Sequence, residues 1–362
     1  MIELPVRLPE IAYLQTMNVP PSMIPPGVDM IGAPAEWKET QGEEVKTVVL
    51  DTGKPNHPDI TVKGAVDFTG TGVDDRQGHS THVCGTICAN GKTKGVGPKI
   101  DLYTAKVLND QGYGQYAWLL NGLRWAIDNK MDIISMSLGM SLPPDTRMHD
   151  LLKEAVAKGI VIVVAAGNSG EWGPGQNTVM YPAEYPECIA VAAVDEKKMR
   201  PAWSSAGAPV EVAALGVRVC STWLNGQYRE LDGTSMSTPH VTGAVAILIR
   251  KRRIRKLPVT VDRIREDLAV FSEDIGPIGR DNFHGYGVFS FGRPGSYEIN
   301  LEFTVGQKTY LKNGQPVEGV APSIIHEDRA YSPLRDVGNA FEAAVAYDHT
   351  TKKITIKKTS AA

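Results

Sequence analysis

Cysteine is scarce in this chain, and long hydrophobic runs are missing. Four cysteines among 362 residues are too few for the disulfide framework of a small secreted protein, and the first residues carry no secretory signal pattern. We therefore expect reduced thiols and a cytoplasmic protein. The longest apolar runs, residues 160–166 and 241–249, fall far short of the roughly 20 residues that a membrane-spanning helix needs. No membrane partner is expected.

A large excess of charge of one sign is also missing, because the formal net charge is -3 at pH 7. This balance excludes the strong field that attracts nucleic acid or an anionic membrane surface. The one basic cluster, residues 250–256, ends an apolar helical pattern. There its cations complement the negative end of the helix dipole. The sequence thus predicts no nucleic-acid partner.

Short apolar runs rich in β-branched residues alternate with helical patterns from residue 45 onward. Such runs suit strands that are covered on both faces. Their alternation with helices predicts an α/β fold with a mostly parallel sheet flanked by helices. Polar groups from several strands meet at the carboxyl edge of a sheet of this kind. The predicted strands cover residues 45–50, 102–107, 133–138, 160–166 and 189–194, and the predicted helices cover 79–89, 116–129 and 148–158.

The two ends of the chain differ from this middle part. Six prolines before residue 27 predict an extended arm outside the core, because proline lacks an amide donor and restricts its neighbour. After Arg293 the alternation gives way to a small α+β unit. The predicted boundaries are 1–26 for the arm, 27–293 for a large domain and 299–358 for a small domain. Within the small domain, strands are predicted over 303–311 and 354–356, a helix over 333–341 and a turn over 348–351.

Four polar residues stand at the ends of predicted strands or the starts of predicted helices. Asp51 follows one buried strand directly, and Asn168 follows another. His79 opens a helix, and Ser235 comes just before a long apolar helix whose first turn is predicted to contain Pro239. Each residue alone has an ordinary structural explanation. Their occurrence together, in the order Asp, His, Asn, Ser, indicates a catalytic site.

These residue types are the ones that nucleophilic catalysis needs. A serine hydroxyl is a weak nucleophile until a neutral imidazole accepts its proton. A buried carboxylate then orients the imidazole and stabilises its charged form. The negative oxygen of the intermediate needs hydrogen-bond donors, which the Ser235 amide and the Asn168 side chain can supply. The sequence therefore contains a nucleophile, a base, an orienting carboxylate and two donors.

The chain resembles the subtilisin-like serine proteases over residues 26–293. The segments around Asp51, His79 and Ser235 match the three signature blocks of that family, and the stretches between them are similar as well. The resemblance implies a three-layer fold and a serine endopeptidase that acts on polypeptides without a required cofactor. It also implies that these three residues form the catalytic triad and that Asn168 belongs to the oxyanion hole.

The same resemblance implies where a substrate binds. Two edges of the protein would pair with extended substrate backbone, as in strand addition. Met180 stands where the family often has a small residue, so its side chain would shorten the pocket for the residue before the cut and disfavour large aromatic side chains. The implied edges are Gly112, Tyr113 and Gly114 on one side and Ser137, Leu138 and Gly139 on the other, and the implied pocket wall is Ala165, Ala166 and Gly167.

Both terminal segments carry resemblances of their own. The arm is similar to that of the intracellular subtilisins, in which a proline-containing extension lies across the active site and is later removed. Residues 6–11 are the corresponding segment, and Pro9 is expected to spoil the amide geometry needed for cleavage. The small domain resembles one first described at the amino terminus of copper amine oxidases, which implies docking or packing and no copper. The sequence leaves open whether the protein forms a homo-oligomer.

The chain departs from the family where a tight calcium site is usual. Residues 88–95 form a short basic segment without carboxylates, whereas calcium prefers six or more oxygen ligands, several of them anionic. We expect that site to be missing, although the matching Asp59 is present. A weak calcium site near Ala183, Tyr185 and Glu211 stays open, and no other metal site is predicted.

Three other interpretations compete with the triad. Asp51-Thr-Gly is also the signature of aspartic proteases, but those enzymes need a second such carboxylate, which only a homodimer would supply. A zinc site is conceivable from His79, His82, Cys84 and Cys88, whose spacings share a helix face. The last alternative is a catalytically silent subtilisin-like scaffold kept for binding, although no position of the predicted site is substituted.

Overall fold

The computed structural model describes residues 5–8, 12–141, 143, 145–170 and 176–292, followed by seven separate strands between residues 301 and 357. The chain divides into two compact units, Met1–Arg293 and Pro294–Ala362. Each unit is described by itself below.

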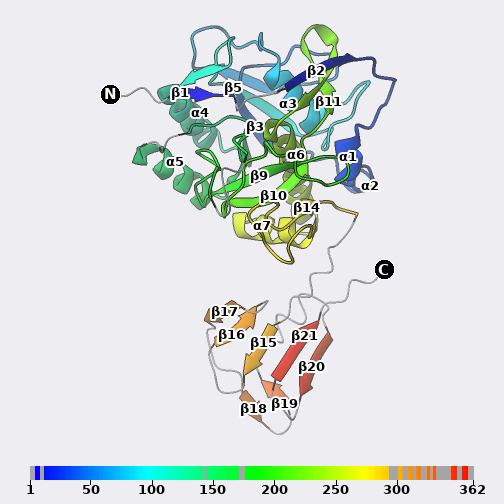
Figure 1. Ribbon diagram of the computed structural model, residues 1–362, viewed down its shortest axis with the longest axis vertical. Coiled ribbons are helices and arrows are strands. Elements are labelled where there is room, and N and C mark those ends of the chain that lie inside the picture. Colours follow the sequence, from blue (N-terminus) through cyan, green and yellow to red (C-terminus); the bar gives the residue numbers. More distant parts are fainter. Residues whose placement is uncertain are drawn as a thin grey trace. The chain divides into compact units, whose positions relative to one another are not determined.

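A sheet of nine described strands forms the centre of the first unit (Figure 1). Its order is β13-β14-β10-β9-β8-β7-β3-β5-β4. All neighbouring strands are parallel except β13 and β14, which are antiparallel. The mostly parallel sheet predicted from the sequence is thereby confirmed. The strands are β3 (Lys46–Asp51), β4 (Gly64–Asp67), β5 (Asp101–Lys106), β7 (Ile133–Met136), β8 (Val161–Ala165), β9 (Cys188–Val194), β10 (Val210–Leu215), β13 (Ser272–Glu273) and β14 (Val288–Phe289).

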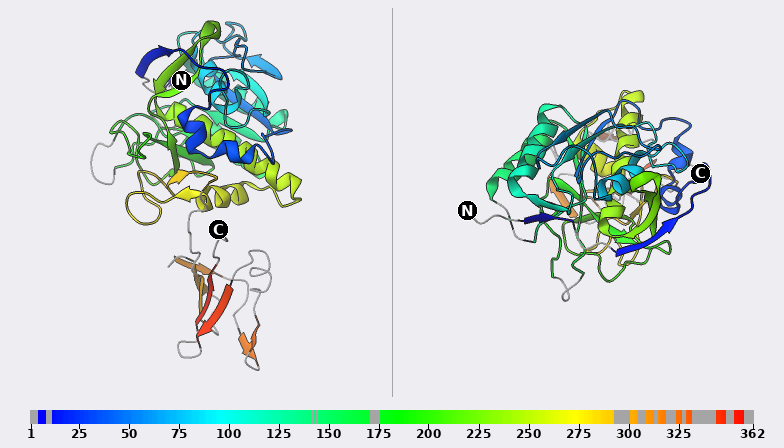
Figure 2. Two further views of the ribbon diagram at one scale, coloured as in Figure 1. Left: turned by 90° about the vertical axis from the view of Figure 1, so that its right-hand side faces the viewer. Right: turned by 90° about the horizontal axis from the view of Figure 1, so that it is seen from above.

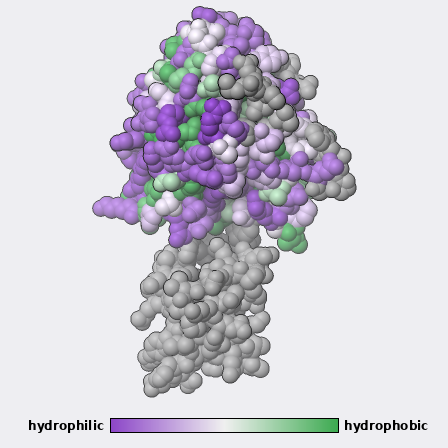
Figure 3. Space-filling view, turned by 90° about the vertical axis from the view of Figure 1, so that its left-hand side faces the viewer, coloured by the Kyte–Doolittle hydropathy of each residue, from purple (hydrophilic) through white to green (hydrophobic). Residues whose placement is uncertain are grey.

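Helices cover both faces of this sheet, which gives the three layers expected. Successive residues of a strand point to opposite faces, so Val48 and Leu50 of β3 pack with one group of helices and Val49 packs with the other. Hydrophilic residues dominate the side of the unit seen in Figure 3, and hydrophobic residues occur there in small groups. The helices on the first face are α4 (Tyr116–Asp128) and α5 (Thr146–Ala157), and those on the second are α3 (His79–Cys88), α6 (Thr234–Ile254) and α7 (Val261–Val270).

The long helix α6 is buried along most of its length, and its proline lies deeper than predicted. Pro239 is the sixth residue of the helix, so the prediction of a first-turn proline was wrong. A proline there has no amide to donate to the carbonyl four residues earlier, which belongs to Ser235. The Ser137 hydroxyl donates to that carbonyl instead, over 3.0 Å. The Ser235 carbonyl is therefore bonded to Ser137, the residue that follows β7, and not to an amide of its own helix.

The basic end of α6 is engaged in ion pairs on the surface of the first unit. Four cations of the helix and Arg255, the residue that follows it, contact carboxylates of neighbouring segments, which is consistent with the solvated helix end expected from the sequence. No described helix combines the length and the apolar character needed to cross a bilayer. The pairs are Arg250 with Glu44, Lys251 with Glu36, Arg252 with Asp267, Arg253 with Asp132, and Arg255 with Glu39.

The amino-terminal arm contains two strands that lie at separate places on the first unit, drawn in dark blue in Figures 1 and 2. β1 (Pro5–Arg7) pairs antiparallel with β6 (Tyr113–Gln115). Val6 of β1 is fully buried in the same apolar cluster as α4 and α5, so the expectation of an arm wholly outside the core was wrong. Burying a valine stabilises by about 1.5–3 kcal/mol, which favours the docked position of this strand.

The second arm strand, β2 (Ala12–Met17), extends a small sheet. It pairs antiparallel with β12 (Tyr228–Asp232), which in turn pairs antiparallel with β11 (Val219–Thr222). Two short helices, α1 (Pro26–Met30) and α2 (Ala33–Glu36), follow the arm, and a 3-10 turn (Leu224–Gly226) joins β11 to β12.

The described part of the second unit is made of strands. Five of them form an antiparallel sheet in the order β17-β16-β15-β21-β20, and two more form a hairpin. The single strand predicted over 303–311 is in fact two strands, β15 and β16, which pair antiparallel. The prediction overlooked Gly306, a residue that favours turns. The predicted helix over 333–341 and the turn after Asp348 lie outside the described residues. The strands are β15 (Leu301–Thr304), β16 (Thr309–Lys312), β17 (Gln315–Glu318), β18 (Ile324–His326), β19 (Arg329–Tyr331), β20 (Ala344–Asp348) and β21 (Lys353–Lys357).

Candidate active site

Asp51 and His79 are held together in the interior of the first unit. Asp51 is the last residue of β3 and His79 is the first residue of α3, and both side chains are buried. The His79 Nδ1 atom lies 2.7 Å from Asp51 Oδ1 and 2.9 Å from Oδ2. The carboxylate thus accepts the Nδ1 proton, which leaves Nε2 as the acceptor of the neutral imidazole.

A second carboxylate, which the sequence analysis missed, fixes the start of α3. Asp75 accepts from the amides of Gly78 and Thr81, at 2.9 and 2.8 Å, and from the Thr52 hydroxyl at 2.9 Å. The same hydroxyl accepts from the Ser80 amide. These bonds tie the end of β3 to the first turn of α3, so they position Asp51 against His79. The signal in the sequence was an acidic residue just before a helix, where unpaired amides need acceptors.

The candidate nucleophile, Ser235, lies at the start of α6 and contacts Ser137 in both directions. Its hydroxyl donates to the Ser137 carbonyl over 3.1 Å, while the Ser137 hydroxyl donates to the Ser235 carbonyl. His79 Nε2 is buried and has no hydrogen-bond partner among the described residues. The predicted bond between the serine hydroxyl and the imidazole is therefore not formed in this conformation. Rotation about one side-chain bond moves a serine hydroxyl between acceptors, and catalytic bonds often tighten only with substrate bound.

Asn168 follows β8 and is fixed by its neighbour in α6. Its Oδ1 accepts from the Thr234 amide at 3.0 Å and from the Thr234 hydroxyl at 2.8 Å. The Gly167 amide donates to that hydroxyl. Because the carboxamide is planar, these bonds turn its NH₂ group away from Thr234. Thr234 is a second positioning residue that the sequence analysis missed, although its place beside Ser235 was visible.

The two predicted binding edges contact the same arm strand from opposite sides. Val6 lies opposite Gly114 in β6. On the other side, Arg7 and Gly139 exchange two backbone bonds, with Arg7 donating over 3.2 Å and Gly139 over 3.0 Å. The structure thus brings both edges around one extended peptide strand.

Met180 lies between Gly139, on one predicted binding edge, and Gly167, in the predicted pocket wall. Its amide donates to the Ala166 carbonyl over 2.8 Å. A methyl group placed on Gly139 would lie 3.1 Å from Met180 Cε, and one on Gly167 would lie 2.7 Å from Met180 Cγ. The thioether side chain therefore packs directly against both glycines.

Asp59, the residue matching a calcium ligand of the family, is occupied by protein donors. Its carboxylate accepts from the Thr93 amide at 3.0 Å and from the Tyr228 hydroxyl at 2.8 Å. A methyl group on Gly91 would come within 1.9 Å of Asp59 Oδ1, so this glycine lets the segment 88–95 approach the carboxylate closely. Within the described ranges, no three His, Cys, Asp or Glu side chains gather in a way that could hold a metal ion.

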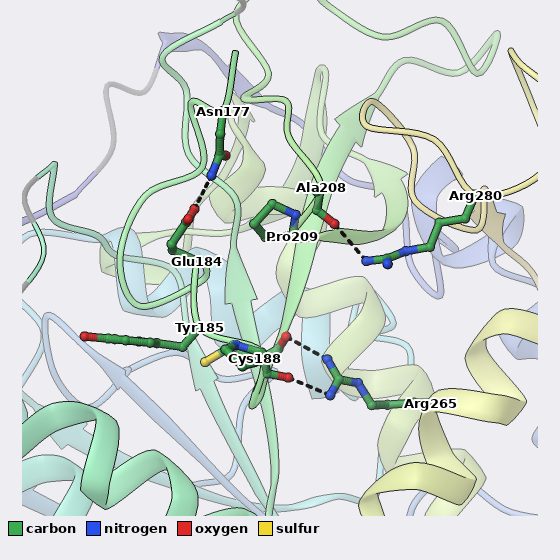
Figure 4. Close-up of a pocket in the computed structure, with 9 residues that line it drawn as sticks. Asn177, Glu184, Tyr185, Cys188, Ala208, Pro209, Arg265 and Arg280 are labelled. Atoms are coloured by element: carbon green, nitrogen blue, oxygen red, sulfur yellow. Dashed lines mark hydrogen bonds between the residues drawn. The ribbon is translucent and has the colours of Figure 1, made fainter. Parts of the chain in front are cut away.

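The Arg265 side chain contacts Glu211, the acidic residue of the weak calcium site left open by the sequence. The Arg265 guanidinium contacts both Glu211 oxygens and donates to the carbonyls of Pro186 and Cys188. A cavity of about 500 Å³ adjoins it (Figure 4). None of its lining residues belongs to the predicted catalytic or substrate-binding set. They are Asn177, Glu184, Tyr185, Pro186, Cys188, Ala208, Pro209, Arg265 and Arg280.

The residues of the zinc alternative do not share a site. His82 Nε2 lies 3.0 Å from the Val219 carbonyl and 3.1 Å from the Arg229 carbonyl, so it faces β11 and β12. The Cys88 thiol donates to the Cys84 carbonyl. Burial raises the pKa of the Cys88 thiol to about 12 and that of Cys84 well above its usual value. Protonated thiols are poor metal ligands.

Two buried histidines make the protein sensitive to acid. Burial lowers the pKa of His82 to about 3 and that of His240 to about 4, against 6.5 in an unfolded chain. Between these values only the unfolded state takes up the protons, so stability is complete above pH 6.5 and falls as the pH drops toward 4. From pH 7 to pH 5 each histidine should cost about 2 kcal/mol of unfolding free energy.

Urea unfolding of a Ser235→Ala protein, which avoids self-digestion, should therefore give a free energy about 4 kcal/mol lower at pH 5 than at pH 7. In a His82→Asn variant, whose amide can still donate to β11, the difference should shrink by about half. Equal stability of the parent at both pH values would show that these side chains do not stay neutral in the folded state.

The sequence matches the profiles of two known families. The sequence profile of the subtilase family matches residues 42–287, and that of the copper amine oxidase N-terminal domain matches residues 296–356. The chain belongs to the subtilase family. Both resemblances inferred from the sequence, and the fold that the first one implied, are confirmed.

Named relatives support the same assignment. The chain is 41% identical over 254 residues to subtilisin amylosacchariticus of Bacillus subtilis subsp. amylosacchariticus, an alignment that covers 67% of this chain and 66% of the relative, slightly less than two thirds of it. It is 42% identical over 238 residues to an intracellular serine protease of Paenibacillus polymyxa (62% and 72% covered). It is 39% identical over 256 residues to the major intracellular serine protease of Bacillus subtilis strain 168 (67% and 79% covered).

Proposed function

We propose that this chain is a serine endopeptidase that hydrolyses polypeptides with Asp51, His79 and Ser235. The observation that carries the proposal is the buried Asp51–His79 contact, together with an extended arm strand that pairs with both predicted binding edges. Family membership and the names of the relatives support the same chemistry. The two relatives named as intracellular proteases also support a cytoplasmic location.

In the proposed mechanism, the Ser235 hydroxyl turns from the Ser137 carbonyl toward His79. Its oxygen attacks the substrate carbonyl carbon while its proton moves to His79 Nε2. Asp51 stabilises the imidazolium through Nδ1. The Ser235 amide and the Asn168 NH₂ donate to the oxyanion. His79 then gives the proton to the leaving amine, and the acyl-enzyme is hydrolysed by water in the reverse sense.

The arm is proposed to act as an intramolecular inhibitor, so the full chain would be a zymogen. Its described residues supply the backbone contacts of a bound peptide: two bonds exchanged by Arg7 and Gly139, and a bond from the Leu8 amide to the Gly112 carbonyl at 3.3 Å. Each such bond contributes about 0.5–1.5 kcal/mol, in addition to the burial of Val6. The proposed role of Pro9 in resisting cleavage lies outside the described residues.

The proposed division of the chain follows from these roles. Residues 1–26 form the inhibitory arm, residues 27–293 the peptidase domain, and residues 299–358 a non-catalytic domain for docking or packing. Polypeptides are the proposed substrates.

Removing the arm should raise activity. An inhibitor tethered in the same chain has an effective concentration of about 1 mM, so a peptide substrate at micromolar concentration competes poorly with it. A variant that starts at Val19 should cleave a short peptide with a kcat/KM about 10- to 100-fold above that of uncut full-length protein. Equal rates, with both proteins folded by thermal melting, would show that the arm does not inhibit.

Replacing Met180 with a smaller residue should change which substrate side chain the enzyme prefers just before the cleaved bond. In a Met180→Gly variant of the arm-free protein, the space between Gly139 and Gly167 opens to larger side chains. The kcat/KM ratio for phenylalanine over alanine at this position should rise by about tenfold or more. The alanine peptide is the internal control for folding. A parent enzyme that already prefers phenylalanine or tyrosine would contradict the assignment of Met180 to the pocket.

A catalytically silent scaffold remains the second candidate, favoured by one observation. The Ser235 hydroxyl is bonded to Ser137 and not to His79. Reaction of Ser235 with an electrophile that requires an active triad separates the two candidates.

A further inference from the structure

The second arm strand marks a surface that no part of the proposed catalytic chemistry uses. β2 pairs with β12 over five positions, from Ala12 opposite Asp232 to Met17 opposite Tyr228. The pairing has one irregularity, between Glu230 and Leu231. β12 is the middle strand of its sheet, so without β2 it would present a row of unpaired backbone groups.

This edge begins beside the candidate nucleophile. Asp232, where the pairing with β2 starts, precedes Ser235 by three residues, and from there β2 runs away from Ser235 along β12. The other arm strand, β1, lies on the opposite binding edge. The described parts of the arm thus pair first with one side of the candidate site and then with the other, in a single chain direction.

Contacts with α3 keep the β12 edge in place without help from β2. His82, in the helix that begins with His79, bonds the carbonyls of Val219 and Arg229. The hydroxyls of Ser221 and Thr222 donate to backbone carbonyls of the same helix at 2.8 and 2.7 Å. None of these contacts with β11 and β12 involves the arm, so we expect the edge to persist when the arm departs.

The side chains along β12 are chemically distinct. At its far end Tyr228 forms a small buried cluster with Cys220 and Val19, and Met17 packs against this cluster. Nearer the site, Glu230 accepts from the Gln15 amide at 3.3 Å and is paired with Arg218. A peptide bound along β12 would therefore place an apolar side chain beside Tyr228 and a neutral hydrogen-bond donor beside Glu230.

We propose that, once the arm has left, β12 binds the leaving-side half of the substrate polypeptide as an added strand. This inference rests on the proposed peptidase function and deepens it: the substrates are extended, unfolded segments that continue for several residues beyond the cut. Main-chain bonds supply the affinity, and the apolar site at Tyr228 selects among sequences. Before the arm leaves, β1 covers the edge at β6 and β2 covers the edge at β12.

Two truncations test this pairing, and both leave the nine-stranded sheet and its helices intact, since these elements lie after residue 26. A variant starting at Val19 lacks β2, whereas a variant starting at Ala12 keeps it on β12. Quenched peptides with the same acyl side and leaving sides of about three or about eight residues are compared, the longer one ending in methionine.

With the Val19 variant, kcat/KM for the long peptide should exceed that for the short one by about tenfold, mainly through KM, because several backbone bonds are gained. N-methylation of alternate leaving-side amides should abolish the gain. With the Ala12 variant, length should have no effect, because β2 fills the edge. Cleavage of both peptides at equal rates by the Val19 variant would overturn the inference alone, whereas cleavage of neither would overturn the proposed function and the inference with it.

Discussion

A Ser235→Ala variant of the arm-free protein is expected to lose about six orders of magnitude in kcat, the size known for removal of the nucleophile in the related enzyme subtilisin. Alanine cannot form the acyl-enzyme, so only stabilisation of the intermediate by the remaining donors persists. Steady-state cleavage of a fluorogenic peptide measures the loss. The hydroxyl contributes one bond to the Ser137 carbonyl, so folding should be little affected.

A matched control lies two residues further along α6. Ser237 is also buried, and its hydroxyl has no hydrogen-bond partner within the described residues. Ser237→Ala should therefore keep kcat within about a fewfold of the parent. Comparable losses in the two variants would mean that the helix, and not the Ser235 hydroxyl, is responsible for the effect.

Replacing Asn168 with alanine should lower kcat by about 100- to 1,000-fold while KM changes little, as found for the oxyanion donor of subtilisin. The proposed reason is that the NH₂ group, oriented by the two bonds from Thr234 to Oδ1, would interact with charge that exists only after attack. A donor that bound the ground state equally well would alter KM instead.

The control for this variant is Asn129→Ala. Asn129 is an exposed asparagine after α4 whose amide bonds the Trp125 carbonyl, and its loss should leave both constants unchanged. An Asn168→Ala enzyme with undiminished kcat would remove Asn168 from the oxyanion hole.

The strands, the helices and the positions of the polar residues were predictable because their signals are local. Runs such as 160–166 are rich in valine and isoleucine, and Asp51 and Asn168 directly follow such runs. In a parallel sheet, all strand ends of one sense meet at one edge, so these residues had to lie near one another. Residue type and order were then enough to indicate the chemistry.

The contacts that set the resting geometry were not predictable, since they join segments far apart in sequence. The Ser137 hydroxyl can bond the Ser235 carbonyl because Pro239, in the second turn of α6, has no amide to donate to it. The turn in which Pro239 lies depends on where α6 begins, and the sequence gives that start only to within a few residues. The pairing of β2 with β12 joins segments more than two hundred residues apart, and nothing in the local pattern of the arm specifies that partner. Asp75 does stand just before a helix, but its bond to Thr52, which ties that helix to β3, joins residues 23 positions apart.

The most direct test of the proposed triad is covalent labelling with a fluorophosphonate, followed by intact-mass measurement and peptide mapping. The account predicts one adduct, on Ser235, formed faster in the variant starting at Val19 than in uncut full-length protein and abolished by His79→Ala but not by Ser237→Ala. Absence of the adduct from folded, arm-free protein, or labelling that proceeds equally fast without His79, would contradict it.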